Sequence, residues 1–201
     1  MCSSSSDSGA ENSTIQDTKE LSNYATACFA SGCFWCVEAI YESVDGVVEA
    51  VSGYAGGTEK NPSYRDVSAG KTSHAESVLV YYDPEKINFR TLVRVYYGSQ
   101  DPTTVDGQHP DYGRQYRSII FYASAEEKQI AEEEKAKLED SHVYDAPIAT
   151  EILPFDMFWE AEEYHQNYER LHPEQPYVRS VSVPRLNRFK AKFPELLKKE
   201  E

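Results

Sequence analysis

Cys33 and Cys36 stand three residues apart around the aromatic pair Phe34 and Trp35, in a chain of 201 residues with four cysteines. A CxxC pair can act as a redox-active dithiol, as half of a metal site, or as two small apolar residues in a core. Gly32 ends a short apolar run, and helical spacing of apolar residues begins at Cys33. Free N–H groups and the helix dipole favour negative charge there, so we expect Cys33 to be a thiolate with a lowered pKa.

The histidines do not turn this pair into a metal site. A structural zinc ion needs four ligands, and one CxxC supplies two. Two histidines are seven residues apart and the others are isolated, namely His165 and His172, then His74, His109 and His142. We therefore expect no metal. Simple core packing does not account for paired thiols at a helix start. A thioredoxin-like oxidoreductase, which also carries CxxC at such a position, remains open.

The segment GCFW at residues 32–35 resembles the catalytic motif of the A-type peptide methionine sulfoxide reductases. The likeness continues, in the order of that family, through GYAGG (53–57), NPSYRDV (61–67), HAE (74–76), YDP (82–84) and DYGRQYRS (111–118). These blocks fall within residues 24 to about 170, which is most of the chain. The resemblance implies an enzyme that reduces methionine-S-sulfoxide, free or in proteins, and so repairs oxidised proteins. It implies no metal or organic cofactor.

Sulfoxide reduction needs a nucleophile for the sulfur, a proton for the oxygen and an apolar recess for the methyl group. The resemblance assigns the attack to Cys33 and the recess to Phe34 and Trp35. A recess of fixed handedness selects one epimer of the sulfoxide. That the epimer is S is implied by the family likeness alone.

Glu76 is the candidate proton donor. A glutamate on an alternating strand is ordinarily exposed, but this one lies in a block that matches the family's catalytic glutamate. Packing against aromatic rings would raise its pKa and keep it protonated near neutral pH. By the same resemblance Tyr64 and Tyr116 bond the substrate oxygen, and Asp111 supports them through water. Taken alone, each tyrosine would be read as a core ring and Asp111 as a loop residue.

Cys36 is the expected resolving thiol. Attack by Cys33 leaves a sulfenic acid, which condenses readily with a nearby thiol, and the sequence contains no cysteine after Cys36. Helical positions three apart hold their Cβ atoms about 5–6 Å apart, whereas a disulfide prefers about 3.8 Å, so we expect the first turn to distort. Cys28 is expected in the core, with backup resolution as an alternative. A thioredoxin-like dithiol protein is the expected reductant.

Two other functions stay open from the sequence. One is a general thiol–disulfide oxidoreductase that uses the same CxxC, and the other is a tethered binding module with a structural dithiol. Charge excludes a further class: 20 basic and 34 acidic residues give −14, without a basic stripe, so no nucleic-acid partner is expected. No apolar run approaches the roughly 18 residues of a transmembrane span. We expect a monomer.

The amino end differs from the rest. Residues 1–22 are Ser-rich and polar, which predicts a disordered tether ahead of a single catalytic domain over 23–201. Cys2 followed by four serines resembles the start of a mature bacterial lipoprotein. The alternatives are therefore a lipid-anchored envelope protein, if a signal peptide was removed, and a cytoplasmic protein with an incidental cysteine.

Periodicity and turn residues predict the elements that must position the site. Strands are expected over 24–30, 47–57, 73–84, 117–123 and 146–154, and helices over 33–45, 88–97, 125–140 and 158–171. A long polar loop covers 98–116, and a proline-punctuated coil forms the carboxyl-terminal tail. This order predicts an α+β fold, a two-layer sandwich of the ferredoxin-like kind with a mostly antiparallel sheet.

Overall fold

The structure is a computed structural model and describes residues 21–199. Cys2 and almost all of the expected tether lie outside the described residues, so the lipoprotein interpretation stays a prediction. Over 21–199 no helix combines the length and apolar character that crossing a membrane requires.

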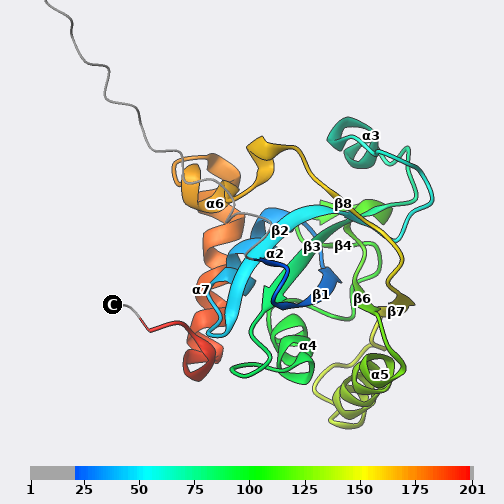
Figure 1. Ribbon diagram of the computed structural model, residues 1–201, viewed down its shortest axis with the longest axis vertical. Coiled ribbons are helices and arrows are strands. Elements are labelled where there is room, and N and C mark those ends of the chain that lie inside the picture. Colours follow the sequence, from blue (N-terminus) through cyan, green and yellow to red (C-terminus); the bar gives the residue numbers. More distant parts are fainter. Residues whose placement is uncertain (1–20, 200–201) are drawn as a thin grey trace, which may run out of the picture.

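A six-stranded sheet with the order β7-β6-β1-β3-β2-β8 forms the centre of the molecule (Figure 1). Its strands are β1 (Ala25–Ala30), β2 (Val47–Ala55), β3 (Ala75–Tyr82), β6 (Ile119–Tyr122), β7 (Glu151–Pro154) and β8 (Phe158–Glu160). A separate ribbon pairs β4 (Gly107–Gln108) with β5 (Asp111–Tyr112). The helices are α2 (Phe34–Glu42), α3 (Tyr64–Ser68), α4 (Phe89–Gly98), α5 (Ala125–Asp140), α6 (Tyr168–Leu171) and α7 (Val183–Lys192). Short 3-10 or π turns are η1 (Arg114–Tyr116), η2 (Glu163–His165), η3 (Val178–Ser182) and η4 (Pro194–Leu196).

The sheet is antiparallel except where β6 pairs with β7 in parallel. If the short elements α3, β4, β5 and η1 are left out, β1-α2-β2-β3-α4-β6 come in β-α-β-β-α-β order, with the four strands arranged as β6-β1-β3-β2. In Figure 1, α7 lies beside α2, on the side of the molecule away from α5. The predicted α+β class with packed helices and a mostly antiparallel sheet is confirmed.

Alternation along the strands separates two apolar clusters. On β1, Ala27 and Phe29 belong to the large cluster shared with α2 and α4, whereas Cys28 and Ala30 belong to a smaller one on the opposite face. On β3, Val78 and Val80 belong to the large cluster. Successive strand residues point to opposite faces, so residue 76 also points toward the helices. This parity places a carboxyl group in the helix-side core.

The expected helix over 158–171 is wrong. Phe158–Glu160 is strand β8, which pairs with β2, and only Tyr168–Leu171 is α-helical. The physical reason is a side chain that replaces backbone pairing. The Gln166 amide accepts from the Ser52 N–H at 2.9 Å and donates to the Ser52 carbonyl at 2.9 Å and to the Ala161 carbonyl at 3.0 Å. These bonds hold the chain after β8 along β2 in an irregular path.

The carboxyl-terminal tail is not the expected coil. Its described part contains the π turn η3 running directly into α7, which buries Arg185 and Phe189. Proline at 184 does not interrupt the helix, because it lies in the first turn of α7. The Val183 N–H bonds the Val178 carbonyl just before this proline, so η3 and α7 stay joined. The tail therefore forms part of the packed core.

An ion-pair cluster holds α5 against α4. Glu134 has a side chain only 8% exposed and bonds Arg90 at 2.7 Å, Lys137 at 2.7 Å and Arg94 at 3.2 Å. Burial opposes ionisation, but the hydrogen bonds from the three cations outweigh it and lower the pKa of Glu134 to about 2. The carboxylate thus stabilises the fold above the ordinary glutamate pKa and loses its contribution as pH falls toward 2.

Glu134→Gln should lower the free energy of unfolding near neutral pH by about 1–3 kcal/mol, because the cations lose their charged acceptor. Urea unfolding followed from neutral pH into acid should show a shallower loss of stability below about pH 4.3 in the variant than in the wild type. Glu132→Gln is the matched control, since Glu132 is exposed and lies 3.6 Å from Lys128. Equal acid profiles for both variants would contradict the assignment.

Candidate active site

The sharp passage from β1 into α2 sets the position of Cys33. Gly32 has φ +75, and a Cβ there would lie 2.8 Å from the Cβ of Gln108, so both conformation and space require glycine. Its N–H donates to the Tyr116 carbonyl at 3.1 Å, which ties the turn to η1. Cys33 is the N-cap residue of α2, is 7% exposed and has extended rather than helical dihedrals, φ −58 and ψ 125.

Glu76 meets the start of α2 through one main-chain bond. The Phe34 N–H donates to the Glu76 carboxyl at 3.1 Å. Glu76 is 2% exposed and lies on β3 opposite Tyr54. Burial, reinforced by the nearby charges of Asp111 and Cys36, raises the pKa of Glu76 to about 8 despite this hydrogen bond. The carboxyl group is therefore protonated at neutral pH and can give a proton away.

Tyr64 and Tyr116 come from different elements, α3 and η1, and face the same charges. The ring of Tyr64 stacks against that of Phe34, with the ring centres 6.2 Å apart. The main-chain N–H of Tyr64 donates to the Glu162 carboxylate at 2.9 Å. Burial and the charges of Glu76 and Cys33 raise the pKa of Tyr64 to about 12 and also raise that of Tyr116. Both hydroxyls stay protonated at physiological pH and can donate a hydrogen bond.

A histidine that the sequence interpretation left unassigned orients Trp35. The indole N–H of Trp35 donates to His165 Nδ1 at 3.1 Å, and the indole stacks on Tyr168 at 3.7 Å with an interplanar angle of 6°. Burial lowers the pKa of His165 to about 4, so the ring is neutral. The His165 ring also lies 5.1 Å from Phe34 and 4.2 Å from Tyr64. These rings form an aromatic wall next to Cys33.

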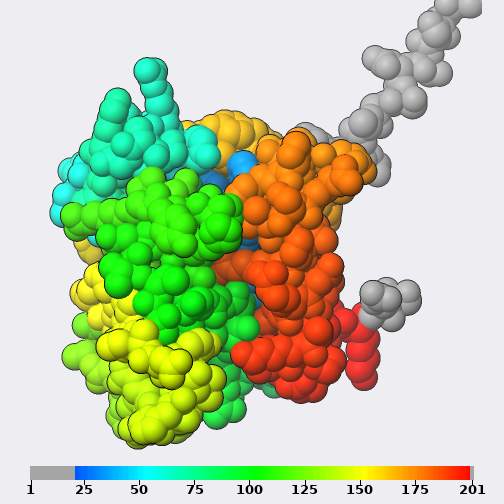
Figure 2. Space-filling model, turned by 180° about the vertical axis from the view of Figure 1, so that it is seen from behind, coloured from blue at the N-terminus to red at the C-terminus, as the bar shows by residue number. Residues whose placement is uncertain are grey.

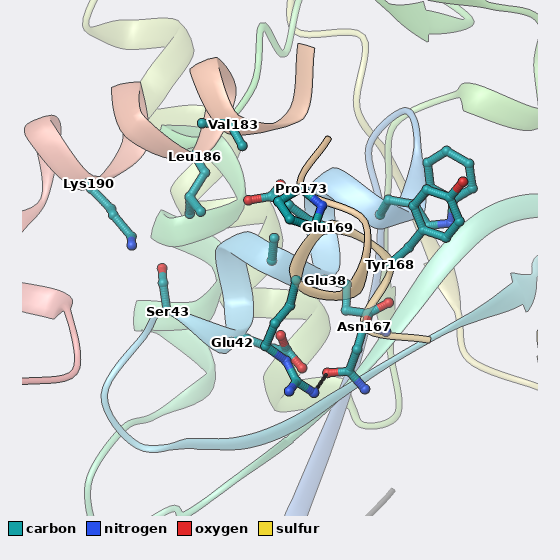
Figure 3. A pocket seen from close by; sticks show the side chains of 13 residues that line it. Glu38, Glu42, Ser43, Asn167, Tyr168, Glu169, Pro173, Val183, Leu186 and Lys190 are labelled. Carbon is teal, nitrogen blue, oxygen red and sulfur yellow. Dashed lines mark hydrogen bonds between the residues drawn. The ribbon is translucent and has the colours of Figure 1, made fainter. Parts of the chain in front are cut away.

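Glu38 holds the chain segment that carries this histidine. Its buried carboxyl accepts hydrogen bonds from the Ser52 hydroxyl and the Asn167 N–H, and burial raises its pKa to about 8. Figure 3 shows it at a cavity of about 430 Å³ together with Asn167 and Tyr168. There the Asn167 side chain accepts from Arg170 at 2.7 Å. The cavity extends along α2 beyond Trp35. Through its bonds to Ser52 and Asn167, Glu38 anchors the chain after β8 to α2 and β2.

Asp111 contacts the dithiol through a second residue that the sequence interpretation left out. The Tyr177 hydroxyl donates to the Asp111 carboxylate and lies 3.8 Å from Cys36 Sγ. Burial raises the pKa of Asp111, and Tyr177 opposes this. Asp111 thus has a direct protein partner. This bond is separate from the water-mediated support of the substrate expected for Asp111.

The pKa values of the two thiols are shifted in opposite directions. Burial raises the pKa of Cys33, whose thiol also donates to Cys36 and lies near the charges of Cys36 and Glu76. The hydrogen bond from Cys33 lowers the pKa of Cys36 to about 6 against the effect of burial, with help from Arg185, Ser182 and Tyr177. The lowered pKa expected for Cys33 is wrong here, because its burial outweighs the helix start.

Cys28 lies away from this chemistry. It packs in the small cluster on the sheet face opposite the helices, and burial raises its pKa. Cys28, Cys33 and Cys36 are all free thiols. Within 21–199, no three or more His, Cys, Asp or Glu side chains gather in a way that could hold a metal ion.

The structure brings the predicted site residues together from four parts of the chain. Figure 2 shows the segment around residues 100–120 and the carboxyl-terminal segment on either side of a hollow in which atoms of the amino-terminal part are visible. These residues lie close enough together for their charges to raise one another's pKa values, namely Cys33, Glu76, Tyr64, Tyr116 and Asp111. The residues that sequence reasoning missed are His165, Tyr177 and Arg185. All three lie in segments whose helical or coil assignment was wrong.

The chain matches the model of the family described as peptide methionine sulfoxide reductase over residues 25–197. It is 44% identical over 179 residues to the peptide methionine sulfoxide reductase MsrA of Polynucleobacter asymbioticus, covering 89% of this chain and 94% of that one. The MsrA of Thermus thermophilus is also 44% identical, over 172 residues, with 86% and 97% coverage.

Two solved structures are similar in fold. Methionine sulfoxide reductase A of Corynebacterium diphtheriae has a TM-score of 0.67 and 35% identity, covering 75% of this chain and 76% of that one. Mxr1 of Saccharomyces cerevisiae in its reduced form has a TM-score of 0.64 and 36% identity, covering 75% and 87%.

A buried dithiol beside a protonated carboxyl and an aromatic wall defines a thiol-dependent oxidoreductase. The chain belongs to the peptide methionine sulfoxide reductase family, and the resemblance drawn from its motifs is confirmed. The protein is accordingly an oxidoreductase that acts on methionine sulfoxide. The alternative of a binding module without activity is set aside by this membership.

His165→Leu should leave the half-buried indole N–H of Trp35 without its acceptor, at a cost of about 0.5–1.5 kcal/mol. We expect a lower melting temperature and a looser aromatic wall. The loosening should reduce the ratio of kcat/KM between the two sulfoxide epimers. His142→Asn is the control, because His142 is exposed and asparagine tolerates the positive φ at that position. Unchanged epimer discrimination in His165→Leu would show that the histidine does not shape the recess.

Proposed function

We propose that the protein reduces methionine-S-sulfoxide to methionine through a Cys33 sulfenic acid, which Cys36 resolves to a disulfide that a thioredoxin-like protein reduces. The observation that carries the proposal is the placement of the protonated Glu76 carboxyl, bonded to the Phe34 N–H, directly beside the Cys33 N-cap. A protonated carboxyl and a thiol therefore lie in one buried region, which supports their proposed roles as proton donor and nucleophile.

In the first half-reaction the Cys33 proton passes to the Cys36 thiolate, and a Cys33 sulfur electron pair attacks the sulfoxide sulfur. Glu76 gives its proton to the sulfoxide oxygen as charge develops there. The hydroxyls of Tyr64 and Tyr116 donate hydrogen bonds to that oxygen. Oxygen then transfers to the Cys33 sulfur, so that methionine leaves and Cys33 remains as a sulfenic acid. The sulfoxide is reduced by two electrons and Cys33 is oxidised by two.

Selection of the S epimer would follow from the aromatic wall. Phe34 and Trp35 offer an apolar recess to the substrate methyl group, while Glu76 lies at the start of α2 to receive the oxygen. Three substituents of the sulfur, namely methyl, oxygen and side chain, are then placed in a fixed order around the attacking thiol. Only one configuration at sulfur satisfies that order.

Resolution requires Cys36 to attack the Cys33 sulfenic acid. The Cys36 sulfur bonds to Cys33 Sγ, the S–O bond breaks, and the hydroxyl leaves with the thiol proton as water. Cys36 is close enough to Cys33 for the two thiols to shift each other's pKa, whereas Cys28 is on the opposite face of the sheet. A thioredoxin-like dithiol then reduces the disulfide by exchange.

An assay with the separated S and R epimers of methionine sulfoxide tests this function against a general thiol–disulfide oxidoreductase. The proposed reaction predicts turnover of the S epimer alone. The alternative predicts reduction of disulfide substrates without methionine release from either epimer. Turnover of the R epimer in preference to the S epimer would overturn the proposed geometry of the recess.

Glu76→Gln should slow methionine release in a single turnover by about a hundred- to ten-thousandfold, the contribution typical of a general acid. Glutamine can still accept from the Phe34 N–H but cannot supply a proton. Because the wild-type carboxyl has a pKa of about 8, its single-turnover rate should fall as pH rises above that value. The variant should lack this descending limb. A descending limb retained at full rate would show that Glu76 is structural.

Cys36→Ser should remove the resolving step while leaving Cys33 able to react. The variant is expected to release one methionine per enzyme and to leave Cys33 trappable by a dimedone-type reagent. Turnover with thioredoxin should collapse, since that reductant attacks a disulfide, whereas a small thiol should restore activity. Cys33→Ser, the control, should release no methionine. Undiminished thioredoxin-driven turnover in Cys36→Ser would exclude Cys36 as the resolving residue.

A further inference from the structure

One carboxylate that takes no part in the proposed reaction joins two of the segments around the aromatic wall. Glu162 stands just before η2, and its side chain reaches two donors that are distant in the sequence. Its Oε2 accepts from the Tyr54 hydroxyl at 2.8 Å, and its Oε1 accepts from the Tyr64 main-chain N–H at 2.9 Å. Burial opposes ionisation of Glu162, but these bonds and one from its own N–H outweigh burial and lower its pKa. The side chain is therefore a carboxylate at neutral pH, with one oxygen for each donor.

Tyr54 anchors this carboxylate to the central sheet. It is fully buried on β2, opposite Glu76 of β3, and its ring centre lies 5.9 Å from that of Phe34. A buried hydroxyl without a partner is costly, and the Glu162 carboxylate supplies the acceptor. The bond fixes Glu162 relative to the two strands at the proposed proton donor.

The helix that carries Tyr64 has few other attachments. It is five residues long and lies in the connection between β2 and β3, away from the other helices (Figure 1). A helix of this length is unstable by itself. Within residues 21–199, two hydrogen bonds join α3 to distant segments. One is the Glu162 bond at its first residue, and the other runs from the Gln115 amide to the Ser68 carbonyl, at 3.1 Å, at its last.

Apolar packing holds α3 but leaves the Tyr64 ring some freedom. Val67 is buried in the large apolar cluster, and the Tyr64 ring stacks on Phe34 near the charge of Glu76. Aromatic contacts allow several arrangements of similar energy, whereas a hydrogen bond is directional. The bond to Glu162 fixes the main chain from which the Tyr64 ring extends. It therefore limits the positions that the Tyr64 hydroxyl can take.

We propose that Glu162 is a positioning residue for Tyr64, whose hydroxyl it holds toward the substrate oxygen by joining the start of α3 to Tyr54. The inference rests on the proposed function, in which Tyr64 donates a hydrogen bond to the sulfoxide oxygen. Glu162 gives and takes no proton in that reaction. It acts by keeping the tyrosine in place before charge develops on the oxygen, so that no rearrangement is needed at that moment.

Amide hydrogen exchange in the full chain measures the attachment of α3 without any turnover. In Glu162→Leu the Tyr64 N–H loses its acceptor, so the peptide covering residues 60–70 should exchange about tenfold faster. The peptide covering α5 should exchange as in the wild type, which separates this effect from a general loss of stability. Glu163→Leu, at the exposed neighbouring position, is the matched control and should leave both peptides unchanged. Unchanged exchange over 60–70 in Glu162→Leu would overturn the proposal.

Two variants of nearly constant volume complete this measurement. In Glu162→Gln the amide can accept from the Tyr64 N–H and donate to the Tyr54 hydroxyl oxygen, so exchange and activity should stay near those of the wild type. Equal effects in Glu162→Gln and Glu162→Leu would overturn the proposal, because the glutamine removes only the charge. Tyr54→Phe removes the anchor on β2 and should speed exchange over 60–70 to a smaller extent. If Glu162→Leu does not fold, wild-type exchange in Tyr54→Phe would overturn the proposal instead.

The single-turnover release of methionine from the S epimer shows whether Glu162 acts through Tyr64. Tyr64→Phe should slow release by about ten- to a hundredfold, the effect of losing one hydrogen bond to a charged group. Glu162→Leu should slow release by about tenfold, because the same bond is then poorly placed. In the double variant Glu162→Leu should add no further loss, since the hydroxyl that it positions is absent. Losses that multiply in the double variant would overturn the proposal.

These outcomes are separate from those of the proposed function. If the wild type releases no methionine from the S epimer, the proposed function fails, while faster exchange over 60–70 in Glu162→Leu would still assign the position of Tyr64 to Glu162. Normal release of methionine together with unchanged exchange in Glu162→Leu would do the reverse.

Discussion

The hydrogen bond from the Phe34 N–H to Glu76 joins the start of α2 to the middle of the sheet, and the site depends on it. It satisfies a main-chain donor that a helix start leaves free, and it does so with a carboxyl that parity along β3 turns into the core. Because the acceptor is buried, it keeps its proton near neutral pH. One contact therefore caps the helix and holds a protonated carboxyl beside the thiol, and in the proposed reaction that carboxyl gives its proton to the sulfoxide oxygen.

The second constraint is the mutual repulsion of several acidic groups that are buried close together. Cys33, Cys36, Glu76 and Asp111 lie close enough for each charge to oppose the next. Such a group cannot ionise fully in a low-dielectric volume, so its members divide into those that keep protons and those that give them up. The protonated members face the expected substrate oxygen. Cys36, whose pKa is lowered, faces the carboxyl-terminal segment, where the Tyr177 hydroxyl lies 3.8 Å from its sulfur.

Much of the fold and site could be predicted from local pattern, and the failures have a common origin. Strand alternation and helix caps at Asn88 and Ser124 are local signals, and both caps are present. The irregular path after β8 is set by Gln166 bonding Ser52 across 114 residues, which no local pattern carries. Tyr177 and Arg185 act over comparable separations. A signal did exist in the tail, since Val178, Ser182, Arg185 and Phe189 recur at helical spacing and are all buried.

The expectation that disulfide formation distorts the first turn of α2 assumed that both cysteines are helical. Cys33 is instead the N-cap residue, with ψ 125, and only Cys36 lies within the helix. A residue outside the helix can turn its side chain toward the first turn without breaking an i→i−4 bond of its own N–H. Cys33 and Cys36 already shift each other's pKa in the reduced protein. Because Cys33 lies one residue before the helix, its side chain faces the helix start, and the N–H of its neighbour Phe34 donates to Glu76. A side-chain rotation can then bring Cys33 to Cys36, as the proposed disulfide requires.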